Sequence, residues 1–231
     1  MEKAIRSKSE VHVWQGSLNV STAQLTKFKS ILSSDELARS DRFKFEIHRH
    51  RYIVSRGYLR LLLADLLGVA AKEICFGYGS RGKPEVTGIW FNLSHAEDRV
   101  VYCFSPHYLV GIDLEYLLKE VDCDRLSSRF FTPSEARLIQ SMEGKEKQKA
   151  FFQLWTAKEA YLKATGEGLV GGLDKVEIGI DKGESQIKAI ANNKIAAQSW
   201  QLNCFEIEKD FIATVAVRGD GDLTIRQHKL N

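Results

Sequence analysis

The chain has 231 residues and a formal net charge of +3, and 44% of its residues are hydrophobic and 27% charged. This composition excludes a fibrous or disordered protein, and the length allows one large domain or two small ones. The longest apolar stretch, residues 59–71, is interrupted by Arg60, Asp65 and Gly68. It is too short and too polar to span a bilayer, which takes ~20 apolar residues. The four cysteines form no CxxC pair, and the N-terminus carries no secretory signal. We therefore expect a cytoplasmic protein with no membrane contact.

In chain order, the first half predicts helices followed by strands. Apolar residues at helical spacing predict helices over residues 21–32 and 43–67, and Gly68 is suited to end the second of these. Alternating and apolar runs predict strands over residues 11–14, 74–78, 90–94, 99–105 and 108–115.

The second half predicts the same kinds of element again. Thr132-Pro133-Ser134-Glu135 is typical of a helix start, and a long helix is expected over residues 148–165. Further strands are expected over residues 176–180, 186–190, 200–207 and 211–217. The fold class is therefore α+β, with two related lobes that meet near residues 105–110.

A basic segment lies between residues 39 and 60. It holds seven cations and only two anions, Asp41 and Glu46; the cations are Arg39, Arg42, Lys44, Arg49, Arg51, Arg56 and Arg60. Such a segment favours an anionic partner such as phosphate, an acidic protein or nucleic acid, although a solvated helix face would have the same composition.

Two acids end the expected strand over residues 108–115. Since strand side chains alternate, Asp113 and Glu115 point to one side, and hard carboxylate ligands suit magnesium. A third acid, Glu159, lies four residues before Lys163 in the second long helix, so the two share a face. The alternatives are a solvated strand end and a surface ion pair.

A segment suited to phosphate precedes these acids. Arg81 and Lys83 flank Gly82 in an expected turn whose backbone can approach an anion. Ser94 and His95 follow at a strand end and can donate hydrogen bonds to phosphate oxygens.

Taken together, these segments resemble the ordered signatures of one family, the phosphopantetheinyl transferases of the single-chain, two-lobed Sfp type, and in particular their cyanobacterial branch. The resemblance runs from about residue 32 to residue 168. The segments are Gly-Lys-Pro at 82–84, Asn-Leu-Ser-His at 92–95, Gly-Ile-Asp-Leu-Glu at 111–115, Phe-Phe-Thr-Pro-Ser-Glu at 130–135 and Trp-Thr-Ala-Lys-Glu-Ala-Tyr-Leu-Lys at 155–163. It implies two pseudo-symmetric lobes, each with helices packed on a mainly antiparallel sheet. We place them at residues 1–107 and 108–231, with the active site at their interface.

The resemblance also implies the reaction and its residues. The enzyme would transfer the 4'-phosphopantetheine arm of coenzyme A to a serine of an apo acyl or peptidyl carrier protein, releasing 3',5'-ADP. Asp113, Glu115 and Glu159 would hold Mg²⁺. Glu159 would also act on the serine proton, and Lys163 would contact the phosphates.

Coenzyme A is the implied co-substrate. Its predicted contacts are Arg39, Arg51, Arg56, Arg81, Lys83, Ser94, His95, Asp113 and Lys163. Arg39 and Lys83 match cations near the 3'-phosphate. Glu36 departs from the family pattern, because it stands where a second such cation is expected.

Three interpretations remain open on the residues alone, and the first is the transferase. The second is a magnesium-dependent nuclease or phosphohydrolase, which would use the same side chains; the usual nuclease, however, places Glu-x-Lys on a strand, whereas Glu159 and Lys163 share a helix. The third is a non-catalytic protein that binds coenzyme A. The transferase is favoured, and we expect it to be a monomer that does not bind nucleic acid. The carrier protein and pathway that it serves are not indicated by the sequence.

Overall fold

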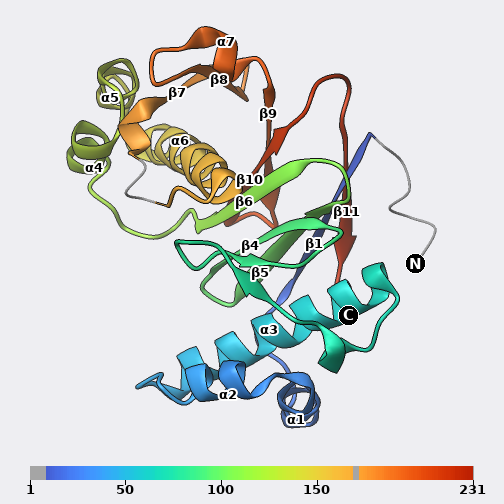
Figure 1. Cartoon of the computed structure of the whole chain (residues 1–231). Helices are drawn as coiled ribbons and strands as arrows, with labels where there is room; N and C mark the ends of the chain where they lie inside the picture. The colour runs from blue at the N-terminus through green and yellow to red at the C-terminus, as the bar shows by residue number, and fades with distance from the viewer. Residues whose placement is uncertain (1–8, 169–171, 231) are drawn as a thin grey trace.

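Two β-sheets pack face to face, and each is covered on its outer side by one long helix (Figure 1). The computed structural model describes residues 9–168 and 172–230. One sheet has four strands in the order β11-β1-β5-β4, and the other has three in the order β6-β10-β9. These strands are β1 Glu10–Ser17, β4 Trp90–Ala96, β5 Arg99–Ser105, β6 Leu109–Tyr116, β9 Trp200–Ile207, β10 Phe211–Arg218 and β11 Thr224–Lys229.

Strand alternation explains why the inner strand β5 of the first sheet is apolar on both faces. On β5, Val101 and Cys103 pack toward the second sheet, while Val100, Tyr102 and Phe104 pack toward helix α3 (Glu46–Leu67). A strand buried on both faces needs apolar residues at nearly every position, as β5 has.

The second sheet is covered by helix α6 (Gly144–Thr165), which packs closely on β6 and β10. The remaining elements lie around these layers. They are α1 Thr22–Ile31, α2 Ser34–Ser40, α4 Cys123–Phe130, α5 Pro133–Gln140, α7 Lys194–Ala197, β2 Gly77–Tyr78, β3 Pro84–Glu85, β7 Val176–Asp181, β8 Glu184–Ile190, and short 3-10 helices at Ala71–Glu73 and Leu173–Lys175.

The two halves repeat one arrangement of helices. Helices α3 and α6 each have 22 residues, and each ends at a left-handed glycine, Gly68 or Gly166. Each is preceded by a short helix with a capping box, Ser33 with Glu36 on α2 and Thr132 with Glu135 on α5. The α+β class is confirmed, and the capping boxes and glycines form a repeat that is not evident in the sequence.

The strand β11 departs from the sequence analysis, which predicts no strand there. It pairs in parallel with β1, so residues 224–229 join the sheet built from the first half of the chain. Its sequence, Thr-Ile-Arg-Gln-His-Lys, is mostly polar because the strand lies at a sheet edge. The division into lobes at residues 107 and 108 stays a proposal.

Within the described parts of the chain, no helix combines the length and apolar character needed to cross a bilayer.

Candidate active site

The site begins where helix α6 touches the backbone of strand β6. Gly111 lies in β6, and a Cβ atom added there would come within 2.1 Å of the Ala160 carbonyl oxygen and 2.5 Å of the Ala164 nitrogen. Only glycine therefore permits α6 to lie this close to β6. The Asn92 side chain of β4 accepts a hydrogen bond from the Ile112 amide at 3.0 Å, which ties the two sheets together at the same point.

Asp113 is the centre of the polar contacts. Its Oδ1 atom accepts hydrogen bonds from Lys163 Nζ at 2.6 Å and Ser94 Oγ at 3.0 Å, and Lys163 Nζ lies 2.8 Å from Ser94 Oγ. Asp113 is only 4% exposed, and its Oδ2 atom is buried without a hydrogen-bond partner among the described residues. A buried carboxylate oxygen with no donor is costly, so this atom is suited to a cation from outside the chain.

The other two acids repel Asp113. Burial and the Asp113 carboxylate raise the pKa of Glu115, and burial and Asp113 also raise the pKa of Glu159 to about 7. Lys119, 3.7 Å from Glu115, and Lys163 both lower the pKa of Glu115, and Lys163 also lowers that of Glu159, but burial and the repulsion between the acids outweigh them. The charges of Asp113, Glu115, Glu159 and Lys163 thus act on one another, and that these residues form one site stays a prediction.

The donor set fits magnesium, because it consists of oxygen atoms with an excess of negative charge. In the described ranges, however, no three or more His, Cys, Asp or Glu side chains are arranged to hold a metal ion. The ligand set therefore stays a proposal.

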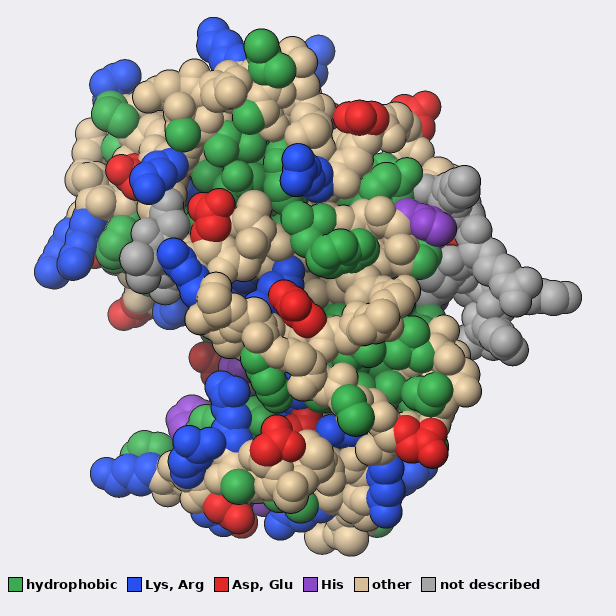
Figure 2. Space-filling view, viewed as in Figure 1, with side chains coloured by type: hydrophobic (Ala, Val, Ile, Leu, Met, Phe, Trp, Pro, Cys, Tyr) green, Lys and Arg blue, Asp and Glu red, His purple; other side chains and the backbone are tan. Residues whose placement is uncertain are grey.

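A pocket of about 440 Å³ is lined by His95, the residue that follows Ser94, which in turn contacts Asp113. The space-filling view shows the molecule hollowed between the part that contains α1 to α3 and the rest, with Lys, Arg and His side chains along the lower wall (Figure 2). The charged and imidazole side chains that line the pocket are Arg39, Arg51, Arg56, His48, His95 and Glu97. Such a wall attracts an anion.

His95 links the pocket to the carboxylates. Desolvation together with the positive charges of Lys163 and Arg51 lowers the pKa of His95, so its ring is neutral at pH 7. It can therefore donate one hydrogen bond without adding charge, while the adjacent Ser94 contacts Asp113.

Two of the residues predicted to contact coenzyme A, Lys83 and Arg81, do not line this pocket. Lys83 donates from Nζ to the Ala164 carbonyl oxygen at 2.8 Å, at the C-terminal end of α6, and burial lowers its pKa. Arg81 is exposed in the turn between β2 and β3 and does not line the pocket. The remaining predicted residues lie in the pocket or at Asp113.

Sequence reasoning missed the roles of Tyr52 and Asn92. The Arg39 guanidinium lies 5.7 Å from the Tyr52 ring centroid, and both residues line the pocket. The signal for Tyr52 was its place one residue after Arg51 in the basic segment, since a ring in a cationic patch is suited to stack on guanidinium groups.

Comparison with known proteins gives the family. A model of the 4'-phosphopantetheinyl transferase superfamily matches residues 109–216. The 4'-phosphopantetheinyl transferase HetI of Nostoc sp. (strain PCC 7120) is 40% identical over 218 residues, which cover 92% of this chain and 89% of HetI. The chain belongs to the 4'-phosphopantetheinyl transferase superfamily.

Three further similar proteins show lower identity or align over a shorter part of the chain. A putative 4'-phosphopantetheinyl transferase, slr0495 of Synechocystis sp. (strain PCC 6803), is 39% identical over 64% of this chain and 63% of its own. Sfp of Bacillus subtilis (strain 168) is 26% identical over 66% of this chain and 68% of its own. A holo-(acyl-carrier-protein) synthase from Bacillus anthracis, solved with coenzyme A (3',5'-ADP), aligns with a TM-score of 0.40 and 22% identity over 48% of this chain and 95% of that chain.

The predicted resemblance to the cyanobacterial branch is therefore confirmed, as is the predicted activity. The transferase moves the phosphopantetheine arm of coenzyme A to a carrier protein. Family membership decides against the nuclease and the non-catalytic interpretations.

Proposed function

We propose that the transferase uses Asp113, Glu115 and Glu159 to hold Mg²⁺, and the pocket beside them to hold the phosphates of coenzyme A. The observation that carries this proposal is the buried Oδ2 atom of Asp113, which has no hydrogen-bond partner among the described residues and belongs to a carboxylate whose charge raises the pKa of Glu115 and Glu159. When bound there, Mg²⁺ would neutralise negative charge on the diphosphate.

Lys163 is suited to steady the leaving group. An ammonium group has three N–H donors, and Asp113 and Ser94 take two of them in the described structure. The third is available for a phosphate oxygen. Because Asp113 and Ser94 fix the ammonium group in place, it can stabilise charge that develops on the departing 3',5'-ADP.

Glu159 is suited to take the proton of the attacking serine. The serine oxygen forms a bond to the β-phosphorus of coenzyme A, the bond from that phosphorus to 3',5'-ADP breaks, and the serine proton passes to the Glu159 carboxylate. Burial and the Asp113 carboxylate raise the pKa of Glu159, which makes this carboxylate a stronger base than an exposed one.

The pocket is suited to the rest of the coenzyme. Arg39, Arg51 and Arg56 line it and carry the positive charge that a nucleotide 3'-phosphate and diphosphate require. His95 also lines it, and the charges of Lys163 and Asp113 act on its ring. We do not assign Lys83 to a phosphate, since its ammonium group caps α6.

We further propose a monomer in the cytoplasm. One chain supplies both the carboxylates and the pocket, so a second copy is not required. All four cysteines are free, which is usual in a reducing compartment.

The test is mass spectrometry of an apo carrier protein incubated with coenzyme A, Mg²⁺ and the enzyme. We expect the carrier to gain one phosphopantetheine unit with the wild type. Replacing Glu159 with Gln (Glu159→Gln) should lower kcat by about 100- to 10,000-fold, the usual contribution of a general base, without loss of the fold. Glu146→Gln, an exposed acid on the same helix, is the control. Turnover of the Glu159 variant at the wild-type rate would remove Glu159 from the mechanism.

A further inference from the structure

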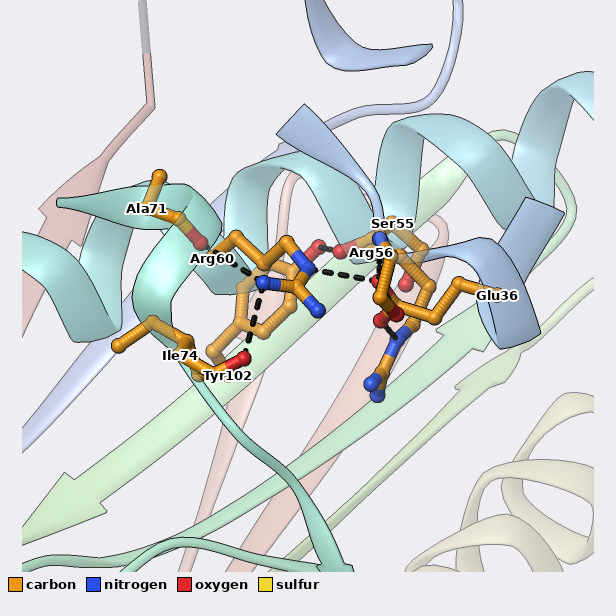
Figure 3. Close-up of polar contacts among 8 residues, drawn as sticks. Glu36, Ser55, Arg56, Arg60, Ala71, Ile74 and Tyr102 are labelled. Atoms are coloured by element: carbon orange, nitrogen blue, oxygen red, sulfur yellow. Dashed lines mark hydrogen bonds and ion pairs between the residues drawn. The ribbon is translucent and has the colours of Figure 1, made fainter. Parts of the chain in front are cut away.

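Glu36 forms a buried cluster with two arginines of helix α3 (Figure 3). Its Oε1 atom accepts a hydrogen bond from Arg56 Nε at 2.5 Å, and its Oε2 atom accepts one from Arg60 Nε at 2.6 Å. The amide and hydroxyl of Ser33 also donate to Oε2, each at 3.0 Å. Burial opposes the charge of Glu36, but the attraction of Arg56 and the donated hydrogen bonds outweigh it and lower the pKa of the carboxyl.

The two arginines have different surroundings. Arg60 is 1% exposed, and its Nη1 atom donates to the carbonyl oxygens of Ala71 at 2.7 Å and Ile74 at 3.1 Å. Arg56 lines the pocket of about 440 Å³, and its Nη2 atom is buried without a hydrogen-bond partner among the described residues. Arg60 is thus occupied by the chain itself, whereas Arg56 keeps a donor free beside the pocket.

The second half of the chain contains the same cluster with one cation fewer. Glu135, in the capping box of α5, pairs at 2.7 Å with Lys158 of α6, and Lys158 donates to the carbonyl oxygens of Leu173 and Val176. Lys158 and Arg60 both lie seven residues before the end of their 22-residue helices. The cluster of one glutamate, one cation and two carbonyl groups is therefore a structural unit that occurs twice.

Arg56 has no counterpart in that unit. The equivalent position of α6, eleven residues before the helix end, is Leu154, a fully buried core residue. An arginine that the structural unit does not require, and that lies on the pocket with a free donor, has a different use.

Three contacts fix the position of Arg56. Glu36 holds its Nε atom, and the guanidinium carbon lies 4.0 Å from the centroid of the Phe76 ring. The Tyr102 hydroxyl donates to the carbonyl oxygen of Ser55 at 2.8 Å, which fixes α3 one residue before Arg56. A long side chain fixed in this way loses little freedom when it binds an anion.

We propose that Glu36 is a positioning residue for coenzyme A binding: it holds the Arg56 guanidinium so that Nη2 is directed at a phosphate group in the pocket. The inference rests on the proposed function, in which the pocket binds the coenzyme. It also explains the departure noted in the sequence, because a glutamate at position 36 supplies no positive charge itself but orients one that comes from α3.

The experiment is isothermal titration of the enzyme with coenzyme A in four forms: the wild type, Glu36→Gln, Arg56→Ala and the double variant. We expect Glu36→Gln and Arg56→Ala each to raise the Kd for coenzyme A by about tenfold, which is the loss of affinity expected when one hydrogen bond to a charged group is removed. In the Arg56→Ala background, Glu36→Gln should have no further effect on Kd. The KM for coenzyme A should rise in step with Kd, while kcat stays within about threefold of the wild type.

Glu135→Gln is the matched control, since it removes the same kind of buried contact far from the pocket. It should lower the melting temperature as Glu36→Gln does and leave Kd unchanged. If Glu36→Gln does not fold, Glu36→Asp replaces it, because aspartate keeps the charge but is one methylene too short to hold both arginines.

The outcomes separate the two proposals. A normal Kd for Glu36→Gln together with a weakened Kd for Arg56→Ala overturns the positioning role alone. Equal weakening by Glu36→Gln with and without Arg56 also overturns it. A normal Kd for Arg56→Ala removes Arg56 from the proposed contacts and overturns the positioning role with it, but leaves Arg39 and Arg51 as the proposed phosphate contacts in the pocket. Titration with 3'-dephospho-coenzyme A identifies the phosphate: if Glu36→Gln has no effect there, the partner is the 3'-phosphate, and if the tenfold loss persists, it is the diphosphate.

Discussion

The variant Gly111→Ala tests how helix α6 is held over strand β6. The added Cβ atom would meet backbone atoms of α6, the Ala160 carbonyl oxygen at 2.1 Å and the Ala164 nitrogen at 2.5 Å. Backbone atoms within a helix cannot rotate away as a side chain can. The helix must therefore retreat from the strand as a unit.

The size of that movement follows from the contact. Real Cβ atoms essentially never come closer than 3.0 Å to such neighbours, so α6 must move by about 1 Å at Gly111. Overpacking of this kind costs about 1–3 kcal/mol, which corresponds to a fall in melting temperature of roughly 2–12 °C for a chain of this length. The same movement separates Lys163 and Glu159 from Asp113. A 1 Å misplacement of reacting groups lowers the rate by about 100-fold.

The assays are thermal unfolding and kcat for phosphopantetheine transfer. Gly179→Ala in β7 is the matched control, because its added Cβ atom would meet only the flexible side chain of Lys188. We expect Gly179→Ala to resemble the wild type in both assays. If Gly111→Ala kept the wild-type melting temperature and kcat, α6 would not be held in place by this contact, and our account of the site's geometry would fail.

Two further predictions concern Lys83 and Glu36. Lys83→Met removes the hydrogen bond to the Ala164 carbonyl oxygen, worth about 1 kcal/mol, and should lower the melting temperature by about 2–4 °C; an unchanged melting temperature would show that the contact does not stabilise α6. Glu36→Gln should lower the free energy of unfolding at pH 7 by about 3–5 kcal/mol, because two buried arginines lose their counter-charge. Since the folded pKa of Glu36 lies below its ordinary value of 4.5, the wild type holds this stability above pH 4.5 and loses it as pH falls through the folded pKa. Denaturant titrations should therefore show the gap between wild type and variant narrowing below pH 4.5; a constant gap from pH 7 to pH 3 would contradict the ion-pair assignment.

Local patterns were enough to predict which side chains of one strand or one helix share a face. Strand alternation placed Ile112 in the core between the sheets and Asp113 on the opposite face, and helical spacing placed Glu159 and Lys163 on one face of α6. These relations depend only on neighbours along the chain.

Contacts between distant segments could not be predicted in this way. Lys83 lies in a turn that suits a phosphate, but in the fold its ammonium group donates to the Ala164 carbonyl oxygen at the C-terminal end of α6, 81 residues away in sequence. Strand β11 carries polar residues because it is an edge strand, and a polar hexapeptide gives no periodic signal. Glu36 was noticed as a departure, yet its partners Arg56 and Arg60 lie 20 and 24 residues further along the chain.

The contact at Gly111 also explains why an Asp-x-Glu pattern alone is a weak signal for a site. In a strand the side chains at positions 111, 113 and 115 share one face, so a glycine two residues before Asp113 leaves a gap on the face that carries the acids. A helix can enter that gap only with small residues, and α6 presents Ala160 and Ala164 there, one turn apart. Glu159 and Lys163 each precede one of these alanines, so the packing that brings the alanines onto Gly111 also brings the acid and the lysine to Asp113. The glycine and the two alanines therefore encode the site as much as the charged residues do, because without them the charges would have no reason to meet.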